Sequence, residues 1–256
     1  AWAAPKVQFL SLAYKPHQVI AVLPETHRFS TPFETLSIAH TDARASLFLT
    51  PSTSLELDRA RLVVDALDIT STLGWTVTMT EGRFAAERVA ATTEAYRLGA
   101  EVLGLEPART TREQLDPGGL LPAQVENLRV DATLAFDRPW DRRAIEAERP
   151  QLTAIDLADL SARWGNITFR AAGDLTVDAQ GLPDGKITVR AVEWRKLLAM
   201  AHAAGWLPES AVGPLESGLE LMSGRTDTLD AELQFSGGAI WLGPIPLGPA
   251  PNLAIR

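Results

Sequence analysis

Apolar and polar residues alternate along much of the chain, and a period of two is typical of β-strands that bury one face. The stretch Leu128–Phe136 ("LRVDATLAF") has an apolar residue at every second position, with polar residues such as Arg129 and Asp131 between them. A strand of this kind turns one face to a core and the other to water. The chain is therefore expected to be mainly β, with a long, curved and mostly antiparallel sheet.

Two later stretches predict hairpins. In residues 167–191 the alternation breaks at Gly173, which predicts a bulge or bend within a long strand. Pro183–Gly185 ("PDG") has the composition of a turn, because proline fixes one φ angle and glycine leaves another unrestricted. Gly237-Gly238 follows an alternating stretch and predicts the turn of the second hairpin.

The N-terminal strands are less one-sided. The stretches "VQFLSLAY" and "QVIAVLP", with Lys15-Pro16 between them as a turn, carry apolar residues on both faces. The stretches "RASLFLT" and "RARLVVDALDIT" follow the same pattern. Such strands are buried on both sides, or they face a cavity, a lipid or a partner. The pattern favours central strands under a helix. In the other interpretation these strands form an apolar ligand-binding groove, whose candidate residues are Phe9, Leu12, Val19, Ala21, Leu47, Leu49, Leu62 and Val64.

Two adjacent stretches near the C-terminus have helical spacing of apolar residues. Residues 194–205 and 208–224 each carry one apolar stripe and end at a glycine, although Gly213-Pro214 predicts a kink or a late start in the second. Together they predict an αα-hairpin that packs on the sheet or plugs one end of it. The residues expected to form this plug are Leu197, Leu198, Leu215 and Leu219.

The rest of the chain offers few further elements. A short helix is expected around Arg112–Leu115. The charged residues 141–150 are the one candidate for an internal division of an otherwise single β-rich domain over residues 1–256. The closing stretch "WLGPIPLGPAP" contains four prolines, each of which removes a backbone donor. We expect an edge strand there, because such a strand pairs on one side at most.

Composition narrows the class of protein. A hydrophobic content of 46% and a charged content of 22% are typical of a globular protein of 256 residues. The net charge of −8 argues against nucleic acid as a main partner, because phosphate binding needs clustered Lys and Arg. The chain has no cysteine, which excludes thiolate catalysis, thiolate metal sites and disulfides. No apolar run approaches the roughly 20 residues that span a bilayer.

Catalytic and cofactor motifs are missing. The four histidines, at positions 17, 27, 40 and 202, lack metal-ligand spacing, although His17 and His40 would converge on neighbouring strands. Asp174 and Asp178 fall on one face of a strand, where acid–base work or Ca²⁺ binding would compete with the favoured interpretation of a solvated face. We therefore predict no catalytic residues, no metal site, no cofactor and no enzymatic activity.

Several stretches carry a resemblance to a known family. They are "LSLAYKPHQVIAVLPE", "LELDRARLVVDAL", "RWGNITFRAAGDLTVDAQGLPDGKITVRAVEWRKLL" and "LGPIPLGPAPNL". The chain resembles an alphaproteobacterial family of envelope proteins of unknown function, which is related to the AsmA-like superfamily. The resemblance implies a membrane-anchoring segment followed by a periplasmic β-rich domain. Larger AsmA-like relatives form long, bent sheets with an apolar groove that shields acyl chains.

These observations lead to two expectations about function. The first is a non-enzymatic periplasmic protein, tethered to the inner membrane, that binds or handles lipid in an apolar groove. The second is a structural or assembly factor that docks on another envelope protein without a ligand. The chain opens "AWAAPKVQFL", with neither a methionine nor a signal-like stretch, so we expect the anchor to be absent from this chain.

Overall fold

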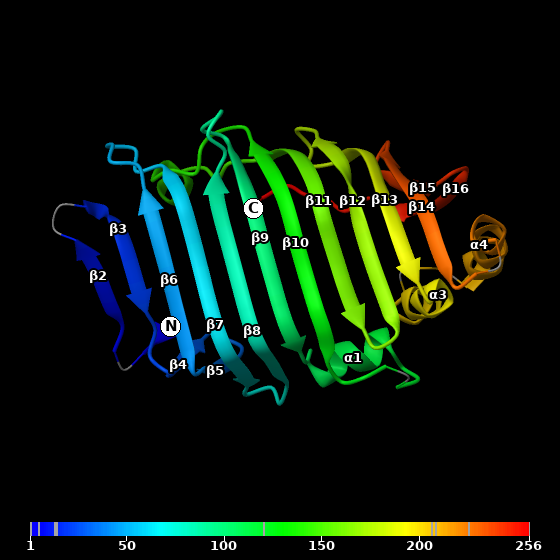
Figure 1. The fold of residues 1–256 in the computed structure, drawn as a ribbon, viewed down its shortest axis with the longest axis horizontal. Helices are drawn as coiled ribbons and strands as arrows, with labels where there is room; N and C mark the ends of the chain where they lie inside the picture. Colours follow the sequence, from blue (N-terminus) through cyan, green and yellow to red (C-terminus); the bar gives the residue numbers. More distant parts are fainter. Residues whose placement is uncertain are drawn as a thin grey trace.

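One antiparallel sheet contains all the strands in the computed structural model of the protein (Figure 1). The structure describes residues 2–4, 6–12, 15–119, 121–205, 207, 209–224 and 226–255. Its strands are β1 (Trp2–Ala3), β2 (Gln8–Leu12), β3 (Lys15–Val22), β4 (Thr26–Ser30), β5 (Thr35–Ala39), β6 (Asp42–Leu49), β7 (Leu57–Ser71), β8 (Thr76–Arg88), β9 (Ala95–Leu105), β10 (Val125–Phe136), β11 (Leu152–Trp164), β12 (Ile167–Val177), β13 (Pro183–Val192), β14 (Thr228–Ser236), β15 (Ala239–Leu242) and β16 (Ile245–Pro249). The helices are α1 (Arg109–Leu115), α2 (Arg143–Glu146), α3 (Trp194–Ala203) and α4 (Glu209–Met222). The expected fold class is confirmed.

The strand register lines up apolar residues across the sheet. One row crosses from β2 to β14 without a polar residue. It consists of Phe9, Ala21, Ala45, Leu62, Phe84, Ala100, Val130, Leu160, Ala171, Val189 and Ala231. The opposite face carries charged rows, for example Arg83, Glu101 and Arg129 on β8 to β10. The sheet therefore has one apolar face and one charged face, as the alternating pattern predicts.

A crease bends the sheet near one end of β7, β8 and β9. Ala66 and Gly104 have positive φ angles of 51° and 61°, and the register places Thr80 between them. A Cβ atom on Gly104 would lie 2.3 Å from Thr80 Oγ1, so only glycine fits this position. Beyond the crease, Met79 packs in the same buried cluster as Val64. The bend thus creates a small core where the sheet folds over itself.

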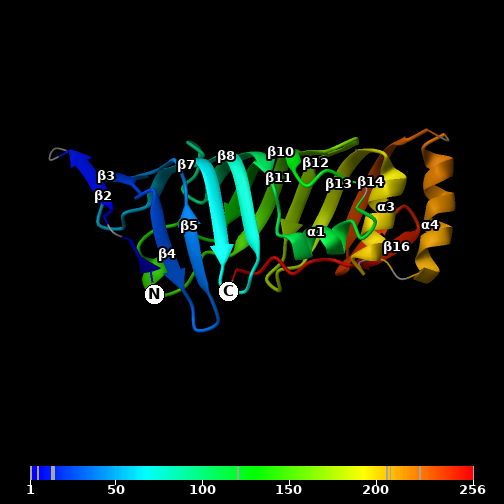
Figure 2. The ribbon, with the colours of Figure 1, turned by 90° about the horizontal axis from the view of Figure 1, so that it is seen from below.

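The sheet forks at the same place. Before Ala66, β7 pairs with β6, and the sheet continues through β3 to the edge strand β2. After Ala66, β7 pairs with β5, and that branch continues through β4 to β1. Figure 2 shows β4 and β5 extending away from the branch formed by β2 and β3. The apolar face of the first branch is therefore left open beside the crease.

The helical hairpin closes the other end of the sheet. Helices α3 and α4 pack against β12 and β14, and the shared cluster includes Ala191, Leu229 and Leu242 from the strands. Trp194, at the start of α3, is only 2% exposed, and its Nε1 donates to the carbonyl oxygen of Thr226 at 3.1 Å. This end of the apolar face is filled and covered.

The closing prolines lie in a hairpin. Trp241 belongs to β15, and Pro246 and Pro249 lie in β16. Within the described part of the chain, β16 pairs with β15 alone and ends the sheet. The edge prediction is therefore confirmed for β16. Residues 250–255 then run back along the ends of the strands, where Leu253 N donates to Gly181 O at 2.8 Å.

One predicted turn is misplaced. Pro183–Gly185 opens β13, and the chain reverses over residues 178–182 instead. The Asp178 carboxylate causes this shift, because its Oδ1 accepts bonds from the backbone N–H groups of Gln180 (2.9 Å) and Leu182 (2.8 Å). Pro183 then serves as the first residue of a strand, a position where no ladder donor is needed. The turn at Gly237-Gly238 forms as predicted, with φ angles of 60° and 75°.

The remaining local predictions fall on described residues. Gly173 has a φ angle of 151°, and the register of β11 against β12 shifts beside it, between Leu157 and Leu160. The bulge predicted at Gly173 is therefore misplaced by one strand: the extra residue lies in β11, and β12 pairs with β13 through Gly173 without a shift. Helix α1 includes the expected residues 112–115. Residues 141–150 contain α2, and the strands that flank them, β10 and β11, pair directly.

Substitutions at the crease test whether it is a strained point of the sheet. Ala66→Gly should raise the free energy of unfolding by about 0.5–1 kcal/mol, because glycine adopts a positive φ without the penalty of a Cβ atom. Gly104→Ala should lower it by about 2 kcal/mol or more. Gly99→Ala, in the same strand but with no atom within 4 Å of its added Cβ, is the control and should be close to neutral. Urea unfolding measures all three, and equal effects at positions 99 and 104 would contradict a strained crease.

A histidine buried at the fork predicts that stability falls in mild acid. His40 is 6% exposed, and this burial, reinforced by the neighbouring His27, lowers its pKa below 6.5. Asp42, Glu25 and the backbone of Pro24 raise this pKa, but more weakly than burial and His27 lower it. The unfolded chain therefore binds the proton more readily, and the free energy of unfolding decreases as the pH falls below about 6.5.

The measurement compares unfolding of the parent chain and His40→Asn at about pH 7.5 and pH 5.5. The variant should lose less stability between these two values than the parent, whatever its absolute stability. Carboxylates with lowered pKa values, such as Asp42, titrate below this range and do not interfere. An identical pH dependence in both proteins would rule out His40 as the cause.

Candidate functional site

A pocket of about 580 Å³ opens on the apolar face of the N-terminal half of the sheet. Strands β2, β3, β6, β7, β8 and β9 contribute its lining. The residues that point to this face and line the pocket are Phe9, Val19, Ala21, Ala45, Leu47, Ala60, Leu62, Phe84, Ala86, Leu98 and Ala100. The alanines leave space that the surrounding Leu and Phe side chains enclose. The result is a hollow in which every side chain of this face is apolar.

The side chains around this pocket are exposed, whereas those in the C-terminal half of the same apolar rows are buried. Ala171, Val189 and Ala231 are each less than 10% exposed, in clusters that the curved sheet and the helices complete. At the N-terminal end, Phe9 is 68% exposed and Leu47 is 39% exposed. The expectation of central strands under a helix is therefore wrong for this edge, because α3 and α4 pack at the opposite end of the sheet.

The predicted groove residues divide into two groups. Phe9, Val19, Ala21, Leu47 and Leu62 line this pocket. Two do not: Val64 belongs to the core beside the crease, and Leu49 ends β6 outside the pocket lining. The prediction for Leu12 is not tested, because its side chain lies outside what the structure describes.

Sequence reasoning missed the contributions of β8 and β9, which include Phe84, Leu98 and Ala100. The sequence pattern of these two strands indicates only ordinary half-buried strands. Only their register against β7 assigns them to the pocket.

The helical residues of the predicted plug lie together at the far end of the apolar face. Leu198, Leu215 and Leu219 are buried in one cluster with strand residues of β13 to β15, and Leu197 packs against that cluster. None of the four belongs to the lining of the open pocket. The sheet thus has a covered end and an open end on the same face.

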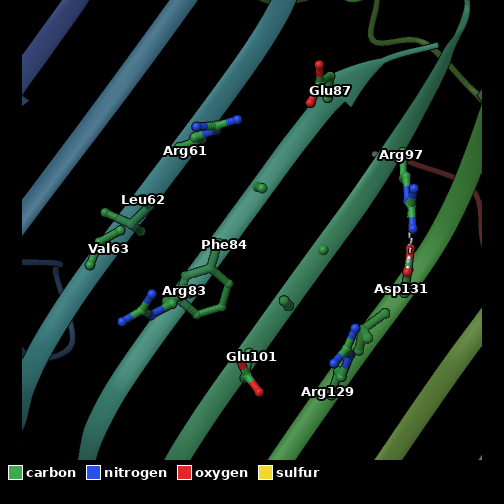
Figure 3. Close-up of a pocket in the computed structure, with 14 residues that line it drawn as sticks. Arg61, Leu62, Val63, Arg83, Phe84, Glu87, Arg97, Glu101, Arg129 and Asp131 are labelled. Carbon is green, nitrogen blue, oxygen red and sulfur yellow. Dashed lines mark hydrogen bonds and ion pairs between the residues drawn. The ribbon is translucent and has the colours of Figure 1, made fainter.

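The charged face carries a separate hollow directly behind the pocket (Figure 3). Ala85 and Gly99 lie among its lining residues, together with arginines and acids of β7 to β10. Arg97 donates two bonds to Asp131, at 2.9 Å from Nε and 2.7 Å from Nη2. These bonds lower the pKa of the Asp131 carboxyl and raise that of the Arg97 guanidinium. Charges of both signs largely neutralise one another here, as expected for a solvated face.

Metal-binding groups do not gather within the part of the chain that the structure describes. The rings of His27 and His40 lie 5.6 Å apart, but no cluster of three or more His, Cys, Asp or Glu side chains fit to hold a metal occurs among the described residues. Asp174 is exposed on β12, and Asp178 belongs to the next turn. The two carboxylates predicted to share a face therefore serve different local structures.

Comparison with known proteins places the chain in a family. No helix among the described residues has the length and apolar character needed to cross a membrane. No curated protein matches the sequence. Residues 1–251 match the family described as "Uncharacterized protein conserved in bacteria (DUF2125)", and the chain therefore belongs to this bacterial family.

Proposed function

We propose that the protein is a non-enzymatic lipid-binding protein that holds acyl chains in the open pocket of its apolar face. The observation that carries this proposal is an uncovered hollow of about 580 Å³ whose inward side chains are all apolar. This volume falls within the roughly 300–1,000 Å³ of small-molecule sites. Unlike most such sites, the pocket meets its occupant mainly with apolar side chains, so the ligand chemistry that fits is a hydrocarbon chain.

The direction of the rows suggests how a chain would lie. Along each strand the apolar face is short, because it is limited by the crease at one end and by the Arg88 ion pairs with Glu56 and Asp58 at the other. Across the strands it is long, since six neighbouring strands about 4.8 Å apart span roughly 24 Å. An acyl chain therefore fits best across the strands.

The energetics favour such binding without directed hydrogen bonds. Each methylene group that leaves water contributes on the order of 0.8 kcal/mol. Immobilisation of a flexible chain offsets part of this gain, so binding should depend steeply on chain length. Because the pocket is open to one side, a polar headgroup can remain in water.

The cellular setting is part of the proposal. As an AsmA-like envelope protein of alphaproteobacteria, the protein would work in the periplasm, tethered to the inner membrane. An apolar pocket held near a membrane would take up lipid without exposing the acyl chain to water.

A charge placed in the pocket should abolish acyl binding. Leu47→Asp puts a carboxylate on the pocket face of β6, and we expect at least tenfold weaker binding of a pyrene-labelled fatty acid, measured by fluorescence titration. Gln18→Asp is the control, because Gln18 lies beside Phe48 on the opposite face of the sheet and outside the pocket lining, so the affinity should stay within about twofold. Thermal melting of both variants excludes unfolding. Equal binding by both would overturn the pocket as the site.

Purified protein should also carry bound lipid. Organic extraction followed by mass spectrometry is expected to release phospholipid or fatty acid from the parent chain and much less from Leu47→Asp. A lipid-free parent protein that crosslinks to another envelope protein in its host would favour the docking function instead.

The location is tested with the full-length protein in its bacterial host. A C-terminal alkaline phosphatase fusion should be active and should sediment with the inner membrane, because this reporter folds only in an oxidising compartment. A β-galactosidase fusion at the same position should be inactive. The reverse pattern would exclude the periplasm.

A further inference from the structure

The edge strand β2 has the composition of an interior strand. It pairs with β3 alone among the strands of the described residues. Phe9 is 68% exposed on the pocket face, and Leu10 is 56% exposed on the other face, opposite Ile20 of β3. Strands with apolar side chains on both faces are normally covered on both sides and paired along both edges. The composition of β2 therefore predicts a further strand on this edge, beyond those of the described residues.

The protein protects its other edges. Strand β16 contains Pro246 and Pro249, which remove backbone donors, and β1 is only two residues long. Strand β2 has none of these features, because the sequence Gln8–Leu12 ("QFLSL") contains neither proline nor charge. An unprotected apolar edge of this kind is a ready template for another strand.

Charge does not oppose the approach of a second copy at this edge. All the acidic residues belong to the rest of the chain, since residues 1–24 contain two lysines and no acidic residue. Two copies that meet through β2 thus keep their acidic residues apart from the contact, and the uncharged strand itself brings no like charges opposite each other.

We propose that β2 pairs antiparallel with β2 of a second copy of this chain, about a two-fold axis perpendicular to the sheet. This symmetry keeps the same face of both sheets on the same side, so the apolar row that starts at Phe9 continues into the second copy. Phe9 of each chain then borders the pocket of the other, and the two pockets join across the seam. Assembly stops at two copies, because the edges that each copy leaves free are the proline-containing strand β16 and the two-residue strand β1.

The geometry gives a sharp test in a chain without cysteine. Opposite residues of an antiparallel pair point to the same face, so one residue of β2 must face its own copy across the axis. Its Cα atoms would then lie about 4.5–5.5 Å apart, within the range of a disulfide. Single cysteines are introduced by Gln8→Cys, Phe9→Cys, Leu10→Cys and Ser11→Cys, and oxidative crosslinking of each is followed over time. One position should crosslink at least tenfold faster than its neighbours.

Phe33→Cys is the control, because Phe33 is the most exposed large apolar residue described and lies outside β2. It should crosslink only at the rate of random collision. Uniformly slow crosslinking at all four positions of β2, at the rate found for position 33, would overturn the proposal. Crosslinking to a different protein in the host, with none between copies, would also overturn it.

Sedimentation velocity adds a readout that does not depend on oxidation. The parent chain should shift from monomer to dimer as its concentration rises, and Leu10→Lys should remain monomeric. Leu10 is absent from the pocket lining, so Leu10→Lys should still bind the fatty-acid probe. Failure of this proposal and failure of lipid binding are therefore distinguishable. A monomeric parent at its highest soluble concentration would refute the pairing.

Discussion

The fold depends on strand register, because a slip of one residue would turn every apolar side chain of a strand to the charged face. The register changes within β11, whose pairing with both β10 and β12 shifts by one residue at the same place. The extra residue is absorbed there as a bulge. The apolar row then resumes at Leu160, which lies opposite Val130 on one side and Ala171 on the other. Continuity of the apolar face thus survives an insertion within a central strand.

The two ends of the apolar face differ in whether other elements cover them. At the C-terminal end, the curved sheet and α3 and α4 bury it, and Trp194 anchors the helices through its bond to the loop before β14. At the N-terminal end, the crease diverts β4 and β5 away from the main sheet, so the branch of β2 and β3 has no layer of its own to cover it. A large apolar surface left open in water is characteristic of a binding surface.

Local patterns predicted the elements better than their arrangement. The strands around residues 128–136 and 167–191 and the helical hairpin follow from side-chain periodicity alone. The crease could not be foreseen, because Ala66 is not a residue that favours a positive φ and is held there by the pairing around it. The turn at Pro183 was misplaced because the Asp178 side chain competes locally for the backbone donors.

Sequence patterns predicted the pocket residues of the N-terminal strands but not those of β8 and β9. Residues apolar on both faces of a strand indicate contact with something, but the sequence does not say whether that is a helix, a ligand or a second copy. Phe84 and Ala100 carry no such signal, and only their place in the register adds them to the pocket. Site residues supplied by regular, half-buried strands are therefore invisible until pairing is known.

The pocket and the β2 edge share a residue, because Phe9 lines the pocket and belongs to β2. An acyl chain that lies across the strands toward β2 would reach the seam and contact the second copy. Any contact of this kind strengthens pairing when the ligand is bound. By thermodynamic reciprocity, pairing must then strengthen ligand binding by the same factor. A lipid-handling protein built in this way would hold its ligand more tightly as a pair and release it more readily as a single chain.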